Sequence, residues 1–259
     1  ILANESVASQ LFYMDLPAVY RVHGDPSEKR LRSFVNVLNT LGIKINDNLS
    51  KITPKTIQRI INRLKNYPQF KVLSVMMLSC MDKAIYDTKN IGHFGIASKC
   101  YTHFTSPIRR YPDTTTHRLL KNYFFDKDGI TDEKIDHFES VLPDICVHSS
   151  ERERASVECE REVDEMKEAE YMEHHIGEEY HGMVSSITNF GMFVILDNLI
   201  EGLVPITELG EYYVYDEKTE SLVAQHSKKH YRIGDELVIS VLRASKKERK
   251  IDFKVVKRI

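Results

Sequence analysis

The sequence predicts an α+β fold, in which a mainly helical amino-terminal part is followed by a small β-barrel. Up to residue 175, apolar residues recur with a period of about 3.6, and at Ile176-Gly177 the period changes to 2. The last eighty or so residues contain five short strand-like runs. We therefore expect two domains, residues 1–176 and 177–259, in a chain of 259 residues that is 42% hydrophobic and long enough to bury a core.

Three amphipathic helices are expected first, over residues 26–42, 53–64 and 70–86. Gly42 is a helix stop, and Pro54 suits a first helical turn because proline needs no amide partner there. The methionine-rich face of the third helix indicates core packing. Residues 92–113 then break the helical rhythm with aromatics, two prolines and paired arginines, which packing alone does not explain.

Further helices are expected over residues 114–125, 133–142 and 151–175, the last of them long and highly charged. Beyond the boundary, the predicted strands cover residues 184–187, 190–197, 201–206, 237–244 and 250–256. Five short strands in about eighty residues suit a small closed barrel, and an OB-fold is the leading option.

Composition excludes several classes of protein. No run approaches the roughly 20 apolar residues of a membrane-spanning helix, and the chain does not begin with a signal-peptide pattern, so we expect a cytoplasmic protein without a membrane partner. The four cysteines are widely separated, which predicts reduced thiols and neither a zinc site nor a disulfide framework. The first residue is not Met, so we expect a fragment of a longer protein.

Charge is segregated along the chain, although the net charge is only −2. Residues 98–125 contain five Lys/Arg against one acid, and residues 228–259 contain eleven against four. Residues 151–179 contain twelve acids and four bases, a run that also fits a solvated helix face. Local basic patches favour a polyanionic ligand, because phosphate contacts release counterions locally.

Residues 182–197, 201–206 and 234–238 together resemble the OB-fold RNA-binding domain repeated in the largest small-subunit ribosomal protein. The resemblance implies aromatic side chains that stack on bases and basic side chains that hold phosphates. By position these are Phe190, Phe193 and Tyr212 or its neighbour Tyr213, with Arg243 and Lys246 as the basic partners.

Alternatives stay open for this aromatic site. On a regular strand Phe190 and Phe193 would point to opposite faces, so one of them could be barrel core, and a bend at Gly191 is needed for both to reach RNA. Pro205 stands where many relatives of that domain have histidine, so one common RNA contact is missing.

The amino-terminal part resembles the closing half of the catalytic RNB domain of the RNase II/RNase R family, and the whole chain is nearest to the RNase R branch. The resemblance is carried by residues 4–8, 17–23, 84–87 and 92–97, and above all by the run His103-Phe-Thr-Ser-Pro-Ile-Arg-Arg-Tyr-Pro-Asp113. It implies a processive, hydrolytic 3′-to-5′ exoribonuclease that releases nucleoside 5′-monophosphates and uses Mg2+.

The resemblance also implies residue roles. Arg109 contacts the reacting phosphate with Arg110 as its neighbour, and Glu151 lies near the RNA 3′ end. A guanidinium fork suits this task because it can grip two phosphate oxygens, and Tyr111 could stack beside the strand. For both arginines the alternative is an ion pair with Asp113. The histidines of this region, His93, His103 and His117, are expected to be hydrogen-bonded structural residues.

The family's metal-binding aspartate cluster has no counterpart in this sequence, so we expect the Mg2+ ligands upstream of Ile1 and no activity from this chain alone. The expected partners are single-stranded RNA and RNA with a 3′ overhang, together with a ribosome or an RNA helicase, for a protein expected to be a monomer. The second hypothesis is a stand-alone RNA-binding module that performs no chemistry.

Overall fold

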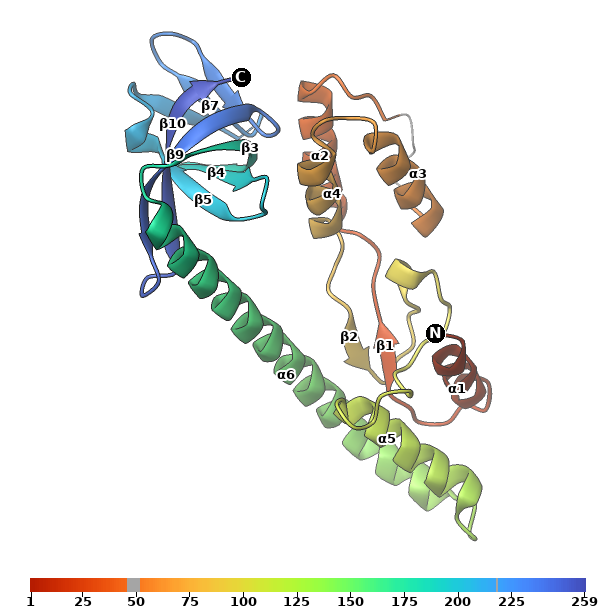
Figure 1. Cartoon of the computed structure of the whole chain (residues 1–259). Helices are drawn as coiled ribbons and strands as arrows, with labels where there is room; N and C mark the ends of the chain where they lie inside the picture. The colour runs from red at the N-terminus through yellow and green to blue at the C-terminus, as the bar shows by residue number, and fades with distance from the viewer. Residues whose placement is uncertain (46–51, 218) are drawn as a thin grey trace. The chain divides into compact units, whose positions relative to one another are not determined.

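A computed structural model describes residues 1–45, 52–217 and 219–259, and it forms two compact units (Figure 1). The first unit consists of residues 1–27 and 81–157 with the described part of 50–57. The second contains the other described residues, including the carboxy-terminal barrel. This division cuts across the predicted domain of residues 1–176, whose extent stays a prediction.

The first unit is built around a short antiparallel pair, β1 (Tyr20–Val22) and β2 (Ile85–Asp87). Helix α1 (Leu2–Tyr13) packs into the same core. The sequence pattern did not suggest this helix, because one of its inward positions is the polar Asn4. Helix α5 (Tyr111–Leu120) continues as a π-helical turn, Lys121–Phe125. It begins three residues earlier than predicted, since Pro112 lies in its first turn. The buried side chains of this core include Ala8, Leu11, Val19, Tyr20, Leu119, Tyr123, Leu142 and Cys146.

The three predicted amphipathic helices are present as α2 (Glu28–Thr40), α3 (Pro54–Leu64) and α4 (Phe70–Ser79). Helix α4 ends at Ser79 and does not reach Tyr86 as predicted, because Tyr86 is needed in strand β2 opposite Arg21.

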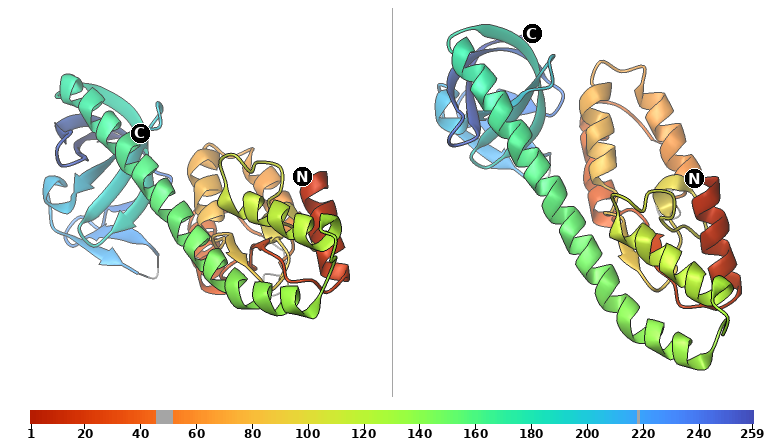
Figure 2. Two further views of the ribbon diagram at one scale, coloured as in Figure 1. Left: turned by 90° about the horizontal axis from the view of Figure 1, so that it is seen from below. Right: turned by 60° about the horizontal axis from the view of Figure 1, so that its bottom comes forward.

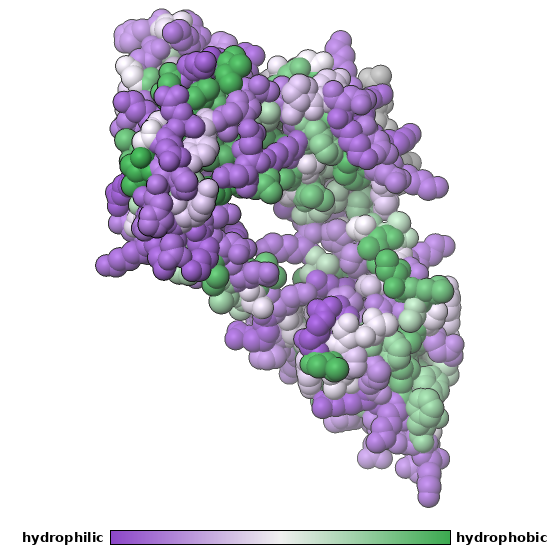
Figure 3. All heavy atoms as spheres, viewed as in Figure 1, coloured by the Kyte–Doolittle hydropathy of each residue, from purple (hydrophilic) through white to green (hydrophobic). Residues whose placement is uncertain are grey.

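Helix α6 (Asp132–Met172) is one continuous helix of 41 residues, where the sequence predicted two (Figure 2). The predicted helices covered residues 133–142 and 151–175 and left residues 143–150, which begin with Pro143, outside both. In the structure Leu142 and Cys146 are buried on either side of the exposed Pro143, and their packing holds the helix together through the proline. None of the helices in the described residues is both long and apolar enough to cross a membrane. Hydrophilic side chains predominate on the face shown in Figure 3.

The barrel confirms the predicted fold class. Its strands are β3 (Glu179–Thr188), β4 (Gly191–Leu196), β5 (Glu201–Pro205), β9 (Glu236–Ser245) and β10 (Lys250–Arg258), closed in the order β10-β5-β4-β3-β9. Between β5 and β9 the chain adds a three-stranded sheet that the sequence did not suggest, β6 (Tyr213–Asp216), β7 (Ser221–Ala224) and β8 (His230–Arg232). The barrel interior is apolar, with Val184, Val194, Val204, Leu237, Ile239 and Phe253 fully buried.

Candidate nucleic-acid interface

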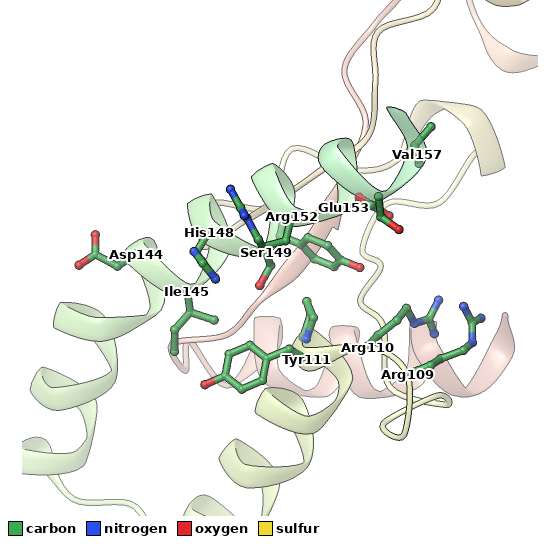
Figure 4. A pocket seen from close by; sticks show the side chains of 13 residues that line it. Arg109, Arg110, Tyr111, Asp144, Ile145, His148, Ser149, Arg152, Glu153 and Val157 are labelled. Atoms are coloured by element: carbon green, nitrogen blue, oxygen red, sulfur yellow. The ribbon is translucent and has the colours of Figure 1, made fainter. Parts of the chain in front are cut away.

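The first unit contains a pocket of about 810 Å³ between the arginine motif and one face of α6 (Figure 4). The motif contributes Arg109, Arg110, Tyr111 and Pro112, and β2 contributes Tyr86. Helix α6 contributes side chains at helical spacing, namely Asp144, Ile145, His148, Ser149, Arg152, Glu153, Ser156 and Val157. Figure 4 labels both motif arginines among the side chains that line the pocket.

Arg110 is held by a buried carboxylate. Its Nε donates to Oδ2 of Asp113 and its Nη2 donates to Oδ1, both at 2.8 Å, and Asp113 is 0% exposed. The backbone N–H of Ser106 donates to the same Oδ1 at 2.8 Å. Asp113 therefore ties the motif loop to the first turn of α5, and for Arg110 the ion-pair alternative is the one found in the structure.

Arg109 differs from its neighbour. Its side chain is exposed, and within the described part of the chain it forms no ion pair. Its backbone N–H donates to the Ser106 carbonyl at 3.3 Å, which fixes the loop rather than the side chain. Arg109 thus presents an un-neutralised guanidinium at the pocket.

A second ion pair lies under the pocket. Arg21 donates to both carboxylate oxygens of Glu153, at 2.6 and 3.0 Å, and its guanidinium lies 4.7 Å from the Tyr86 ring centroid. Burial raises the pKa of Tyr86 to about 12, so its hydroxyl stays protonated. Glu153 is neutralised by Arg21 and adds little negative charge to the pocket.

Of the three histidines predicted to be hydrogen-bonded structural residues, His103 and His117 have hydrogen-bond partners for their side chains, whereas the buried Nδ1 of His93 has none among the described residues. His103 Nδ1 lies 2.8 Å from the Tyr86 hydroxyl, and burial, with the nearby Arg110 and Arg21 guanidiniums, lowers its pKa to about 4. His117 stacks on Phe104 at 4.4 Å between ring centroids. Burial likewise lowers the pKa of His93 to about 4. His93 and His103 are therefore neutral near pH 7.

Tyr111 lines the pocket and is 48% exposed, so its ring is accessible for the predicted stacking. Glu151 is exposed but is not among the lining residues. The face of α6 at the pocket is set by residues 145, 148, 152 and 156, and residue 151 falls outside that face. The predicted role of Glu151 stays a prediction.

His148 and Arg152 line the pocket, and the sequence reasoning missed them. Their spacing of four residues was a usable signal, but the orientation of the helix about its axis was unknown from sequence.

On the barrel the structure brings Phe190 and Phe193 together, with ring centroids 6.2 Å apart and planes at 88°. Phe190 is 53% exposed and Phe193 is half-buried. Gly191 has a φ of +156°, and a Cβ there would lie 2.3 Å from the Val204 carbonyl oxygen. Glycine is therefore required at position 191 by the close approach of β5, while Phe190 meets Phe193 from the turn that precedes β4.

The other predicted barrel contacts are placed less simply. Tyr212 is exposed, whereas Tyr213 is buried. Arg243 Nη2 donates to Glu248 at 2.7 Å. Lys246 pairs through Nζ with Glu170 at the end of α6. RNA contacts by Arg243 and Lys246 would require exchange of these exposed ion pairs, which cost little to break, and they stay predictions.

Among the side chains that the structure describes, no group of three or more His, Cys, Asp or Glu residues is arranged to hold a metal ion. The described residues therefore do not fit a Mg2+ site.

Comparison with known proteins places both parts of the chain. Residues 1–126 match the RNB domain family, and residues 173–255 match the S1 RNA binding domain family. The chain is 43% identical over 253 residues to Ribonuclease R 1 of Lactococcus lactis, covering 97% of this chain and 31% of that protein. It is 42% identical over 257 residues to Ribonuclease R of Thermotoga maritima, covering 99% and 36%.

Solved structures give the same result for the fold. Mycoplasma genitalium RNase R in complex with ribose-methylated single-stranded RNA matches with a TM-score of 0.93 and 32% identity, covering 99% of this chain and 40% of that chain. The chain spans about a third of the length of the curated relatives it matches.

Proposed function

The chain belongs to the RNase R branch of the RNase II/RNase R family, and from this premise we propose that the full-length protein is a processive 3′-to-5′ hydrolytic exoribonuclease. It releases nucleoside 5′-monophosphates. This chain contributes the arginine side of the reaction site and an RNA-binding barrel. The Mg2+ ligands belong to a part of the protein outside this chain, so the chain by itself is inactive.

The observation that carries the proposal is the contrast between Arg109 and Arg110. Arg110 is neutralised by Asp113 and holds the loop, while Arg109, which has no ion-pair partner among the described residues, lines a pocket of about 810 Å³. During phosphodiester hydrolysis, negative charge gathers on the nonbridging oxygens. A positioned guanidinium can donate two hydrogen bonds to them and stabilise that charge more in the transition state than in the ground state.

We propose that RNA contacts two surfaces of this chain. The pocket offers Tyr111 beside Arg109, and the barrel offers the adjoining rings of Phe190 and Phe193. Stacking of a base on an aromatic ring contributes roughly 1–3 kcal/mol and does not select a base. Together these surfaces suit single-stranded RNA and the 3′ overhang of a duplex. Association with a ribosome or a helicase, a monomeric state and a cytoplasmic location stay predictions.

The test is Arg109→Ala in the full-length protein, assayed by the release of mononucleotides from the 3′ end of a single-stranded RNA. We expect kcat to fall about 10²- to 10³-fold, as for loss of one transition-state hydrogen-bond donor, with a smaller change in RNA affinity. Arg154→Ala is the matched control, because Arg154 is an exposed arginine of α6 outside the pocket. Unchanged turnover in Arg109→Ala would remove that arginine from the reaction site.

The barrel is tested separately. Phe190→Ala and Phe193→Ala should each weaken binding of single-stranded RNA about 10-fold in a fluorescence titration, since one stacking interaction is lost. Insensitivity of both variants would refute the stacking assignment without affecting the proposal for Arg109. If the full-length protein binds RNA but releases no mononucleotides, the alternative of a binding module without chemistry is the correct one.

A further inference from the structure

The barrel unit contains a groove of about 600 Å³ that Phe190, Phe193, Tyr212, Arg243 and Lys246 do not line, whereas Tyr213, the buried alternative to Tyr212, does. It lies between residues 208–210, residues 229–231 and the end of β10, residues 254–258. We call it the basic groove. Its cationic lining residues are Lys229, Lys254, Lys257 and Arg258, with His230 beside them and Glu208 as the one acidic residue of the lining.

The end of β10 contributes two of these lysines. Lys254 and Lys257 both line the basic groove, and both are exposed. The pairing of β10 with β9 changes register between Val255 and Lys257, so the strand is irregular where it borders the groove.

Arg258 builds one wall of the groove. Its Nη1 donates to the His230 carbonyl at 2.7 Å, its Nη2 donates to Asp235 Oδ1 at 2.9 Å, and it lies over the Tyr231 ring at 6.0 Å. Arg258 is thus held in place and neutralised. Tyr231 is also in contact with the buried ring of Tyr213, at 5.5 Å between centroids.

Lys229, Lys254 and Lys257 are the charges that remain. Among the residues described in this unit, none of the three forms an ion pair, and all three are exposed. The lining contains one acid, Glu208, and Glu211 lies near Lys229, so three ammonium groups still outnumber the acids and form a local site for a polyanion. Since both tyrosine rings of the groove are already engaged, such a ligand is held by its charge and not by base stacking.

We propose that the basic groove binds the phosphate backbone of an RNA strand, at a site separate from the Phe190 and Phe193 pair. This rests on the proposed function only in that RNA is the ligand of the barrel. Ammonium groups act as point charges without a preferred base, so the contacts are independent of RNA sequence. With the basic groove, the barrel contacts a longer stretch of RNA than the nucleotides that stack on the two phenylalanines.

The experiment compares Lys254→Gln/Lys257→Gln with wild type in the full-length protein. RNA binding is measured by fluorescence anisotropy at several salt concentrations, with single-stranded oligonucleotides of about 4 and about 25 nucleotides, at and beyond the limits of one OB-fold site. For the long RNA, loss of two phosphate contacts should lower the salt slope by about 1.4, since each contributes roughly 0.7 on single strands. At about 0.1 M salt this corresponds to a roughly 25-fold loss of affinity.

Controls separate this site from general charge loss and from misfolding. Lys65→Gln/Lys127→Gln removes the same charge from exposed lysines outside the groove and should leave both the slope and the affinity unchanged. Lys254→Arg/Lys257→Arg keeps the charge and should bind the long RNA like wild type. The 4-nucleotide RNA should bind the groove variant and wild type equally.

Three results would overturn the proposal. They are an unchanged salt slope in the groove variant, an equal loss in the Lys65 and Lys127 control, and an equal loss with the short RNA. An unchanged salt slope would mean that the basic groove does not bind RNA, and an acidic protein would then be the partner that its charge favours. RNA binding and turnover of the wild-type protein are measured in the same series. If the proposed function is wrong, the wild-type protein itself does not release mononucleotides. If only the groove proposal is wrong, the wild-type protein binds and degrades RNA and the groove variant behaves in the same way.

Discussion

Arg109 and Arg110 are neighbours in the sequence, yet the structure gives them opposite roles, and a stability measurement can separate them. Arg110→Gln leaves the fully buried Asp113 carboxylate with only the Ser106 N–H as a partner. Breaking a buried ion pair by removing one partner costs about 3–5 kcal/mol. The Arg110 side chain is 20% exposed, which places the expected loss toward the lower end, about 3 kcal/mol.

The measurement is the thermal unfolding of the full-length protein by scanning calorimetry. For a unit of this size, about 3 kcal/mol corresponds to a fall in Tm of roughly 12 °C for the transition that includes the motif. Arg109→Gln is the matched control and should leave Tm unchanged, because its side chain is exposed and unpaired among the described residues.

A double-mutant cycle sharpens the test. Arg110→Gln combined with Asp113→Asn should destabilise by about 1–3 kcal/mol less than the sum of the single variants, because the second change removes the charge that the first left unpaired. Equal Tm values for Arg109→Gln and Arg110→Gln, or strict additivity in the cycle, would refute the assignment of Arg110 to the fold.

Three further predictions follow from the site and the barrel. The pKa of His103 is lowered to about 4, chiefly by burial, so between pH 6.5 and 4 the unfolded state binds more protons than the folded state. The free energy of unfolding should fall by roughly 2 kcal/mol as pH drops through this window, and a pH series of denaturant midpoints for His103→Gln should lack that part of the fall. Arg152→Gln should weaken RNA binding several-fold and lower its salt slope by about 0.7, with no effect from Arg154→Gln; equal slopes for the two variants would exclude Arg152 from the RNA path. Gly191→Ala should cost more than about 1 kcal/mol of barrel stability because its Cβ would meet the Val204 carbonyl oxygen at 2.3 Å, and an unshifted denaturant midpoint would contradict this.

Local patterns were sufficient for much of the molecule. Alternation with period 2 predicted the five barrel strands, because one face of each strand is buried in the barrel. Helical spacing of apolar residues predicted α2 and α3, because one face of each helix is buried. Phe190 and Phe193 were expected on one strand, where a bend would be needed for both to reach RNA, but Phe190 lies in the turn that precedes β4. The predicted strands and helices depend on neighbouring residues, which the sequence shows directly.

Other features depend on residues that are distant in the sequence. Two separate helices were predicted over residues 133–142 and 151–175, but Leu142 and Cys146 are buried in the first-unit core and α6 is continuous through Pro143. Tyr86 was predicted to be the last residue of a helix, but in the structure it lies in strand β2, which pairs with β1.

The same limit applied to the candidate site. The sequence by itself determined that the motif from His103 to Asp113 offers two guanidiniums and one carboxylate. Only the tertiary structure decided that the carboxylate is buried against Arg110 and that Arg109 is left to face the pocket, since burial sets which charges must be paired. It also decided that Arg152 and not Glu151 faces that pocket, because the packing of α6 fixes its orientation about its own axis.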